Sequence, residues 1–389
     1  MIRILIVLSL AFFSLLNANA QSSRSGINLS IWPGLSTQRT DTIRGNTLLN
    51  IGLNSRMNRL NGIGVNALGA TTKRSVHGVQ AAGLFNITGE DLRGIQVAGI
   101  TNVTGENLWG ASISGLVGIV GTDVNGLMVS GGMNIVGEGV QGIIASGLVN
   151  VLGGDSEGVQ LAGISNINGG RTEGLQFAGL FNVSGGDLVG FQISALLNVA
   201  AHEIRGMQVG LLNVANNAKG LQMGLFNFYG SKLDGFQLGL INANPTTRIQ
   251  LLLNGGTSTL FNLGLRFKNR IYYTILSTGS KYRELHPFNI AFTYRAGVAL
   301  PIADAWELSG DLGFQHIESF KKSKLVNRLM NLQARVNIEY YISHSTSLFL
   351  TGGYEQAYIY RHFHHQHRGF FAEFGTAFTI GHFQLAPGN

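Results

Sequence analysis

One run of side chains in this sequence has the composition of a metal-ligand set. Residues 361–368 contain, besides two Arg, one Phe and one Gln, four histidines: His362, His364, His365 and His367. Neutral imidazoles bind zinc, copper and nickel. The spacing follows no fixed zinc motif and brings no carboxylate partner, so a solvated loop is the alternative. The four histidines are therefore a candidate metal site, and the sequence predicts no cofactor.

The motifs of common enzyme classes do not occur in the chain. It has no Gly-rich phosphate loop, nucleophile elbow or zincin motif. Polysaccharide-degrading β-helix enzymes mount acids and bases on loops that project over a cleft, whereas the repeats of this chain have no insertions to build such loops. We therefore expect a protein that is not an enzyme, with a glycan-active β-helix enzyme as the minor alternative.

Side-chain amides recur at fixed intervals of 16 residues. One such column is formed by Asn86, Asn102, Asn134, Asn150, Asn166, Asn182 and Asn198. Gly118 takes the place of one member. Asn tolerates bent backbone, and amides stacked in register bond to those above and below. We interpret this column as a structural ladder.

The element that positions these amides is a repeat of 16 residues. Gly recurs at this interval from Gly62 to Gly206, and the pattern is clearest in Gly174-Leu-Gln-Phe-Ala-Gly-Leu-Phe-Asn-Val-Ser-Gly185. Each interior Gly would cost a helix roughly 1 kcal/mol relative to Ala. Hairpins of a membrane barrel alternate short turns with longer loops, whereas these spacings are identical. The repeat therefore predicts a β-solenoid of 16-residue coils.

Gln occupies the third position of the repeat and is expected to face outward, because its strand parity is opposite to that of the aliphatic second and fourth positions. This column comprises Gln80, Gln96, Gln160, Gln176, Gln192 and Gln208. A flat polar face suits a repetitive ligand such as a glycan, but ordinary solvation of polar side chains explains it as well. The middle copies carry Ser112, Met128 and Ile144 instead. Because adjoining exposed apolar side chains can mark contacts, we expect a partner surface there.

The N-terminus predicts export. Residues 1–20 contain one early cation, Arg3, then an apolar run and the small-x-small ending Ala18-Asn19-Ala20, which is typical of a signal peptide. The chain has no Cys, so disulfides do not stabilise it. Its formal net charge is +7, with basic residues concentrated after residue 265. A basic surface suits anionic lipid headgroups or polysaccharide, and for an exported chain we expect no nucleic-acid partner.

The chain alternates apolar and polar residues from residue 259 onward. We expect an N-terminal strand region at 21–45, the solenoid at 46–234 and an antiparallel β-domain at 235–389. This domain has about seven strands, and the stretch Ile27 to Pro33 is a candidate for another. In an outer-membrane barrel the apolar face meets lipid, Arg and Glu line the lumen, and Trp306, Tyr340 and Tyr358 form aromatic girdles. In a soluble sheet the apolar face packs on the solenoid or closes on itself.

The repeat copies carry a family resemblance. Gly158-Val-Gln-Leu-Ala-Gly-Ile-Ser-Asn166 and the copy from Gly174 to Asn182 resemble the bacterial surface-repeat proteins of spirochaetes and Bacteroidota. The resemblance covers the repeat block and not the C-terminal strands, and the middle copies depart from the motif. It implies a surface or outer-membrane location and no specific activity.

These patterns together predict an all-β fold in which a β-solenoid of 16-residue coils is followed by an antiparallel β-sheet or small β-barrel. We expect an exported, non-catalytic envelope protein of the outer membrane or cell surface, for surface display, adhesion or scaffolding. A glycan or another surface molecule is the expected partner. The alternative is an outer-membrane barrel acting as a channel or ligand-binding protein, in which the repeats are themselves strands.

Overall fold

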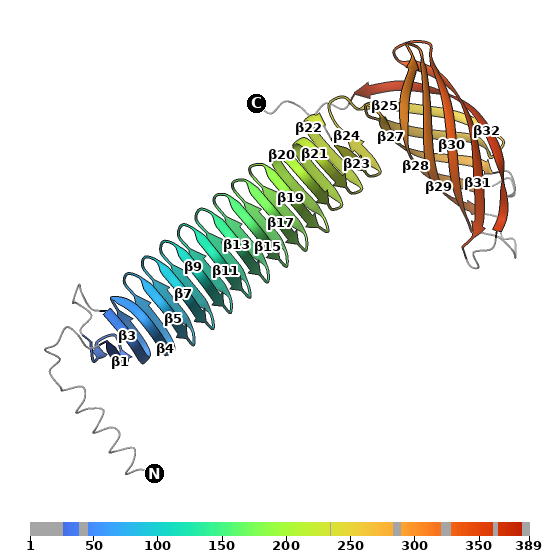
Figure 1. Ribbon diagram of the computed structural model, residues 1–389. Helices are drawn as coiled ribbons and strands as arrows, with labels where there is room; N and C mark the ends of the chain where they lie inside the picture. Colours follow the sequence, from blue (N-terminus) through green and yellow to red (C-terminus); the bar gives the residue numbers. More distant parts are fainter. Residues whose placement is uncertain are drawn as a thin grey trace. The chain divides into compact units, whose positions relative to one another are not determined.

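The computed structural model describes residues 26–38, 46–233, 235–282, 289–319, 328–360 and 365–382. A parallel β-solenoid of about 12 turns is followed by a closed, eight-stranded antiparallel barrel (Figure 1), which confirms the predicted fold class. The chain divides into two compact units, Met1–Gly210 and Leu211–Asn389. Among the described residues, none belongs to a helix long and apolar enough to cross a membrane.

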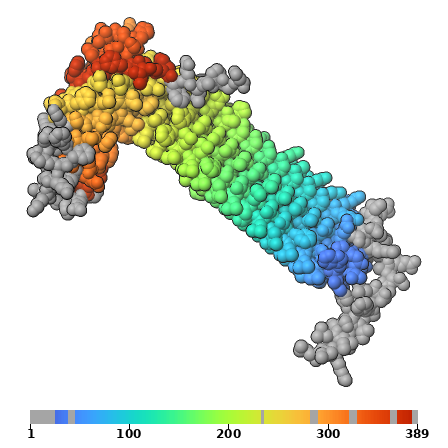
Figure 2. Space-filling model, turned by 180° about the vertical axis from the view of Figure 1, so that it is seen from behind, coloured from blue at the N-terminus to red at the C-terminus, as the bar shows by residue number. Residues whose placement is uncertain are grey.

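The first unit is a stack of coils, seen as regular ribs in Figure 2. It opens with β1 (Ile27–Trp32), β2 (Leu35–Ser36), β3 (Asn46–Met57) and β4 (Arg59–Thr72). The longer strand of each following coil is β5 (Val76–Ala82), β7 (Leu92–Ala98), β9 (Leu108–Ser114), β11 (Val124–Ser130), β13 (Val140–Ser146), β15 (Ser156–Ala162), β17 (Thr172–Ala178) or β19 (Leu188–Ser194). The shorter strand is β6 (Phe85–Thr88), β8 (Thr101–Thr104), β10 (Val117–Val120), β12 (Met133–Val136), β14 (Val149–Leu152), β16 (Ser165–Asn168) or β18 (Phe181–Ser184), and β20 (Leu197–Val209) ends the unit.

The strands pair in parallel with the same positions of the next copy. Gly78 lies beside Gly94 and Gly94 beside Gly110, so one repeat makes one coil. The alternative in which the repeats are strands of a barrel is therefore wrong. Gly94 has a φ of 135°, and a Cβ atom there would lie 2.0 Å from the carbonyl oxygen of Gly78. Only Gly fits this position, which explains why it recurs in every copy.

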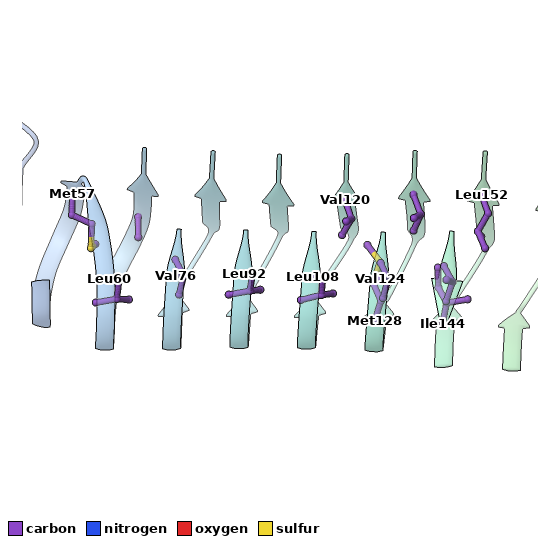
Figure 3. Close-up of a cluster of buried hydrophobic side chains, with 13 residues drawn as sticks. Met57, Leu60, Val76, Leu92, Leu108, Val120, Val124, Met128, Ile144 and Leu152 are labelled. Carbon is purple, nitrogen blue, oxygen red and sulfur yellow. The ribbon is translucent and has the colours of Figure 1, made fainter. Parts of the chain in front are cut away.

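Columns of aliphatic side chains fill part of the solenoid interior. One column runs through Leu60, Val76, Leu92, Leu108 and Val124, which are fully buried (Figure 3). The interior also contains the Gln column, which contradicts the prediction that Gln faces outward. Gln96 is 0% exposed, whereas Ile95 is 44% exposed.

The physical reason for this inversion is the stacking of identical amides. The prediction assumed that apolar side chains lie inside and amides outside, as in most soluble proteins. In parallel coils, however, each amide meets an identical one about 4.8 Å away. Gln192 donates to Gln176 at 2.7 Å and Gln176 donates to Gln160 at 3.1 Å. Burial therefore leaves these amides hydrogen-bonded, and the aliphatic second and fourth positions face outward.

The second unit begins with further coils. Its parallel strands are β21 (Leu212–Met223), β22 (Phe226–Leu233), β23 (Phe236–Leu238) and β24 (Ile241–Ala243). The coils thus continue past the expected boundary at residue 234. The barrel strands follow as β25 (Arg248–Gly256), β26 (Thr259–Lys268), β27 (Tyr272–Tyr282), β28 (Asn289–Ala303), β29 (Trp306–Ser319), β30 (Arg328–Tyr341), β31 (Thr346–Ile359) and β32 (His365–His382).

The eighth barrel strand is β25, not the N-terminal stretch. β25 pairs with both β26 and β32 and so closes the barrel. The N-terminal candidate, Ile27 to Pro33, instead contributes β1, which pairs in parallel with β3 and starts the solenoid. Sequence alternation alone did not distinguish β25, because its run Ile249 to Leu253 is almost continuously apolar.

Candidate functional site

The histidine cluster falls largely outside the part of the chain that the structure describes. His362 and His364 lie outside the described residues. The backbone of His365 and His367 begins β32, where it pairs with Tyr358 and Ala357, but their side chains are not among those described. Within the described residues, no group of three or more His, Cys, Asp or Glu side chains is arranged to hold a metal ion. The metal site stays a prediction.

The Asn column is a ladder of side-chain hydrogen bonds inside the solenoid. Asn150 donates to Asn166 at 2.8 Å, and Asn166 donates to Asn182 at 2.9 Å. Each amide also reaches a backbone carbonyl of the next coil, as Asn166 does with Phe177 at 2.9 Å. All these side chains are buried, so the column presents no amide surface to a ligand.

The three residues expected to form a partner surface are buried as well. Ser112 is 2% exposed, and Met128 and Ile144 are 0% exposed. Their positions belong to the inward-facing Gln column, so the expected contact surface does not exist. Ile144 replaces one ladder amide, and the Nε2 atom of Gln160 in the next coil has no hydrogen-bond partner. The middle coils thus interrupt a structural column.

Among the described residues, the buried charged side chains lie in the barrel. Arg266 holds Glu339 through two hydrogen bonds, of 2.8 Å and 2.6 Å, and also donates to Gln250 at 2.7 Å. Next to this pair, Lys268 contacts Glu307 and donates to the hydroxyl of Tyr341. The two hydrogen bonds between Arg266 and Glu339 make this contact bidentate, which is a strong form of Arg–carboxylate pairing.

A second charged cluster lies farther along the lumen. Arg335 donates to Glu373 at 2.6 Å, and its guanidinium stacks on the ring of Phe371 at 4.7 Å. Asp311 accepts hydrogen bonds from Tyr273 and Asn337, both at 2.9 Å. Because Arg335 is paired with Glu373 and Asp311 accepts two hydrogen bonds, this cluster avoids part of the cost of burying ions.

These side chains fill the centre of the barrel. The cavity bordered by Arg266, Tyr273, Arg295 and Glu339 has a volume of about 10 Å³. A cavity must have at least roughly 10–15 Å³ to hold one water molecule. Leu252, Ile275 and Phe349 pack into the same region. At this level the side chains of the described strands thus leave a cavity no larger than about one water molecule.

The outer wall of the barrel has the opposite chemistry. Large apolar side chains are exposed on it: Phe370 is 84% exposed and Leu312 is 72% exposed. Their neighbours along the strands, Phe371 and Asp311, point into the lumen and are buried. Of the expected aromatic girdle, Trp306 and Tyr340 form a ring pair with centroids 4.8 Å apart beside the turn at 304–305. Tyr358 lies towards the other end of β31, where it donates to Gln356.

One sector of the outer wall is covered by the last coils of the same unit. The hydroxyl of Tyr294 donates to the carbonyl of Gly239 at 2.9 Å, and Thr274 donates to that of Leu240 at 3.1 Å. Tyr272 donates to Gln237 at 3.1 Å. The first two contacts are to backbone carbonyls at the edge of the last coil, and an uncovered coil edge can act as a template for strand pairing. Burial raises the pKa of Tyr229 in β22, so its phenol stays protonated.

Sequence reasoning placed Arg and Glu on one face of the strands but did not identify the pairs. Arg266 and Glu339 are 73 positions apart, and they meet only because of the strand tilt of the closed barrel. The outward hydroxyls that hold the last coil were also missed. Their signal is the polar residues Tyr272, Thr274 and Tyr294 on the face that is otherwise apolar.

Similarity to known proteins was found among solved structures. No protein-family model and no curated protein matches the chain. A de novo designed transmembrane β-barrel is similar with 12% identity and a TM-score of 0.25, over 35% of this chain and 96% of that chain. The N-terminal β-barrel domain of Pseudomonas aeruginosa OprF is similar with 13% identity and a TM-score of 0.25, over 34% of this chain and 96% of that chain.

Proposed function

We propose that this chain is a non-catalytic protein of the bacterial outer membrane, in which the barrel spans the bilayer and anchors the solenoid as a scaffold. The distribution of side chains across the barrel wall carries the proposal. Leu312 and Phe370 point outward, while Arg335 and Glu373 pair inside. In water this arrangement would expose the apolar face and bury ions at a cost. In a bilayer each face meets its preferred surroundings.

The turns of the barrel favour one orientation in the membrane. At one end the connections are 269–271, 304–305 and 342–345, and the chain enters β25 there at Arg248 and leaves β32 at His382. At the other end, two residues separate β25 from β26, whereas six separate β27 from β28, eight separate β29 from β30 and five separate β31 from β32. Outer-membrane barrels have short periplasmic turns and longer extracellular loops. The solenoid joins the barrel at the short-turn end, which favours a periplasmic scaffold over surface display.

The filled lumen argues against the channel alternative. Ions cross a barrel only where the interior leaves a wetted path, and the cavity at the level of Arg266 and Glu339 has a volume of only about 10 Å³. Wide channels among such proteins are built from 16 or more strands, whereas eight strands leave an interior that side chains can fill. We therefore assign the barrel the role of an anchor.

Site-specific labelling in cells tests the orientation, because the chain has no Cys of its own. Three single-cysteine variants serve: Arg328→Cys at the long-loop end, Asp304→Cys at the short-turn end and Glu106→Cys on the solenoid, all exposed positions. With a maleimide that does not cross membranes, we expect intact cells to label only Arg328→Cys. The other two should react after the outer membrane is permeabilised. Labelling of Glu106→Cys in intact cells would establish surface display instead.

A further inference from the structure

A cavity opens at the short-turn end of the barrel. Its volume of about 780 Å³ lies within the range of roughly 300–1,000 Å³ that is usual for ligand pockets. Its walls come from four places in the second unit: the entry to β25 and the turns β26–β27, β28–β29 and β30–β31. We call this cavity the vestibule, and its lining includes Arg248, Lys268, Arg270, Asp304, Glu307 and Tyr341.

The floor of the vestibule is a buried, charged contact. Lys268 is 6% exposed, and its ammonium contacts Glu307 and donates to the hydroxyl of Tyr341 at 2.7 Å. Two residues farther along the same strands, Arg266 and Glu339 pair beside the cavity of about 10 Å³. A ligand in the vestibule would therefore rest on Lys268.

Cations are crowded on one side of the vestibule. Arg248 of β25 lies directly opposite Lys268 of β26, so the two side chains share one face of the sheet. Arg270 follows two residues later, in the turn to β27. Like charges that lie directly opposite each other in a sheet are destabilising. This side of the vestibule therefore favours the addition of negative charge.

The carboxylates of the vestibule offset only part of this charge. Glu307 contacts Lys268, and the second carboxylate of the lining, Asp304, stands in the turn between β28 and β29. No ion pair or side-chain hydrogen bond joins the guanidinium of Arg248 or Arg270 to another residue that the structure describes. Two guanidinium groups thus line the cavity without a counter-ion among the described residues.

A phosphate group matches this arrangement. It bears negative charge at neutral pH on oxygens that accept hydrogen bonds. A guanidinium presents a planar fork of N–H donors that fits such oxygens, and the ammonium of Lys268 has a third N–H donor besides the two in the contacts above. We propose that the vestibule binds a phosphate group through Arg248 and Arg270, with Lys268 beneath it.

Two sources of phosphate share this chemistry, a small phosphorylated molecule and a phospholipid headgroup. The site itself is independent of the proposed function, because its residues and charges do not depend on where the barrel resides. Only the place where the ligand is met rests on the proposed function, since a periplasmic short-turn end would open the vestibule to periplasmic solutes and to headgroups of the inner leaflet.

Isothermal titration calorimetry of the full chain in an uncharged detergent tests the site, at low salt so that screening is weak. The probes are inorganic phosphate and, in mixed micelles, phosphatidylglycerol, and we expect binding of at least one. Arg248→Gln and Arg270→Gln should each weaken that binding roughly 10- to 100-fold, because each removes charge-assisted hydrogen bonds. Arg328→Gln, at the other end of the barrel, should leave it unchanged.

A variant that strengthens binding provides a test that misfolding cannot imitate. Asp304→Asn removes a nearby negative charge and should tighten phosphate binding by roughly 1.5- to 5-fold. If it leaves binding unchanged or weaker, the assignment of the phosphate to this cavity is wrong, and this outcome decides the matter even where an arginine variant fails to fold.

The remaining outcomes separate the two sources and the two levels of the account. Binding of inorganic phosphate identifies a small phosphorylated molecule, and binding of phosphatidylglycerol alone identifies a headgroup. Binding of neither probe, or equal binding by Arg248→Gln, Arg270→Gln and the unaltered chain, would overturn the phosphate site. The folded band on a semi-native gel reports on the barrel independently, so failure of the phosphate site leaves the membrane barrel standing.

Discussion

The side chain of Met128 occupies the space that Gly118 leaves open in the preceding coil. A Cβ atom on Gly118 would lie 2.7 Å from the Cε atom of Met128 and 2.8 Å from the Oδ1 atom of Asn134. That oxygen has no hydrogen-bond partner. The repeat thus lost an Asn and a Gln in adjoining coils, and a single Met fills part of the volume of both. The two departures from the motif form one packing unit.

The first prediction restores the motif in this unit. Gly118→Asn alone should destabilise the solenoid by about 1–3 kcal/mol, because the added side chain overlaps Met128. Combined with Met128→Gln, the same change should be less costly by about 0.5–3 kcal/mol than the sum of the single variants, since the introduced amide could then donate to Asn134. Denaturant midpoints in detergent measure both effects. The control is Met207→Gln, which lies far from Gly118, so its effect on the free energy of unfolding should simply add to that of Gly118→Asn. If this pair departs from additivity as much as Gly118→Asn and Met128→Gln do, Gly118 and Met128 do not form a packing unit.

The second prediction concerns the middle of the Asn ladder. Asn166→Ala removes the acceptor of Asn150 and the donor to Asn182. Leaving such buried groups unpaired costs about 1–3 kcal/mol each, so the midpoint of solenoid unfolding should fall accordingly. The matched control is Asn125→Ala, on the outward face of β11, which should change stability by less than about 0.5 kcal/mol. Equal effects of the two variants would mean that the ladder contributes nothing.

These features show how far the sequence predicted the fold. The 16-residue period determined the solenoid, and alternation revealed the barrel strands after residue 259. The predicted outward orientation of the Gln column was wrong. The rule that amides face solvent holds for isolated amides, whereas Gln176 and Gln192 bond to each other across coils. Which charges pair in the lumen could not be predicted, because Arg266 meets Glu339 only through the tilt of the closed barrel.

The third prediction concerns this lumen pair. Arg266→Met leaves Glu339 buried without its cation and should destabilise the barrel by about 3–5 kcal/mol. The double variant Arg266→Met/Glu339→Met removes both ions and should recover much of that loss. The temperature at which the folded barrel disappears on a semi-native gel measures stability. As a control, Arg328→Met breaks an exposed pair with Glu318, and its effect should stay within about 1 kcal/mol. If the double variant is as unstable as Arg266→Met alone, the loss of stability does not come from leaving Glu339 without its partner.

The fourth prediction concerns the hydroxyls that bond to the last coil. Thr274→Val removes the hydrogen bond to the carbonyl of Leu240, and Tyr294→Phe leaves the carbonyl of Gly239 with its bond from Asn242 alone. Each lost bond should cost about 0.5–1.5 kcal/mol, which increases hydrogen exchange of the amides in β23 and β24. Tyr340→Phe, on the outer wall but outside these contacts, should leave that exchange unchanged. Unaltered exchange in Tyr294→Phe/Thr274→Val would show that the wall does not hold the coil edge.

Electrophoretic mobility of the full chain, extracted from outer membranes in mild detergent and compared before and after heating in dodecyl sulfate, tests the membrane barrel most directly. We expect two bands of different mobility, because a closed barrel resists the detergent until heated. Leu312→Arg should lose the folded band at a lower temperature, since a cation on the lipid-facing wall costs about 2–4 kcal/mol near the bilayer centre. A single band unaffected by heat, from a chain that alkaline carbonate washes off the membrane, would contradict a barrel that spans the bilayer.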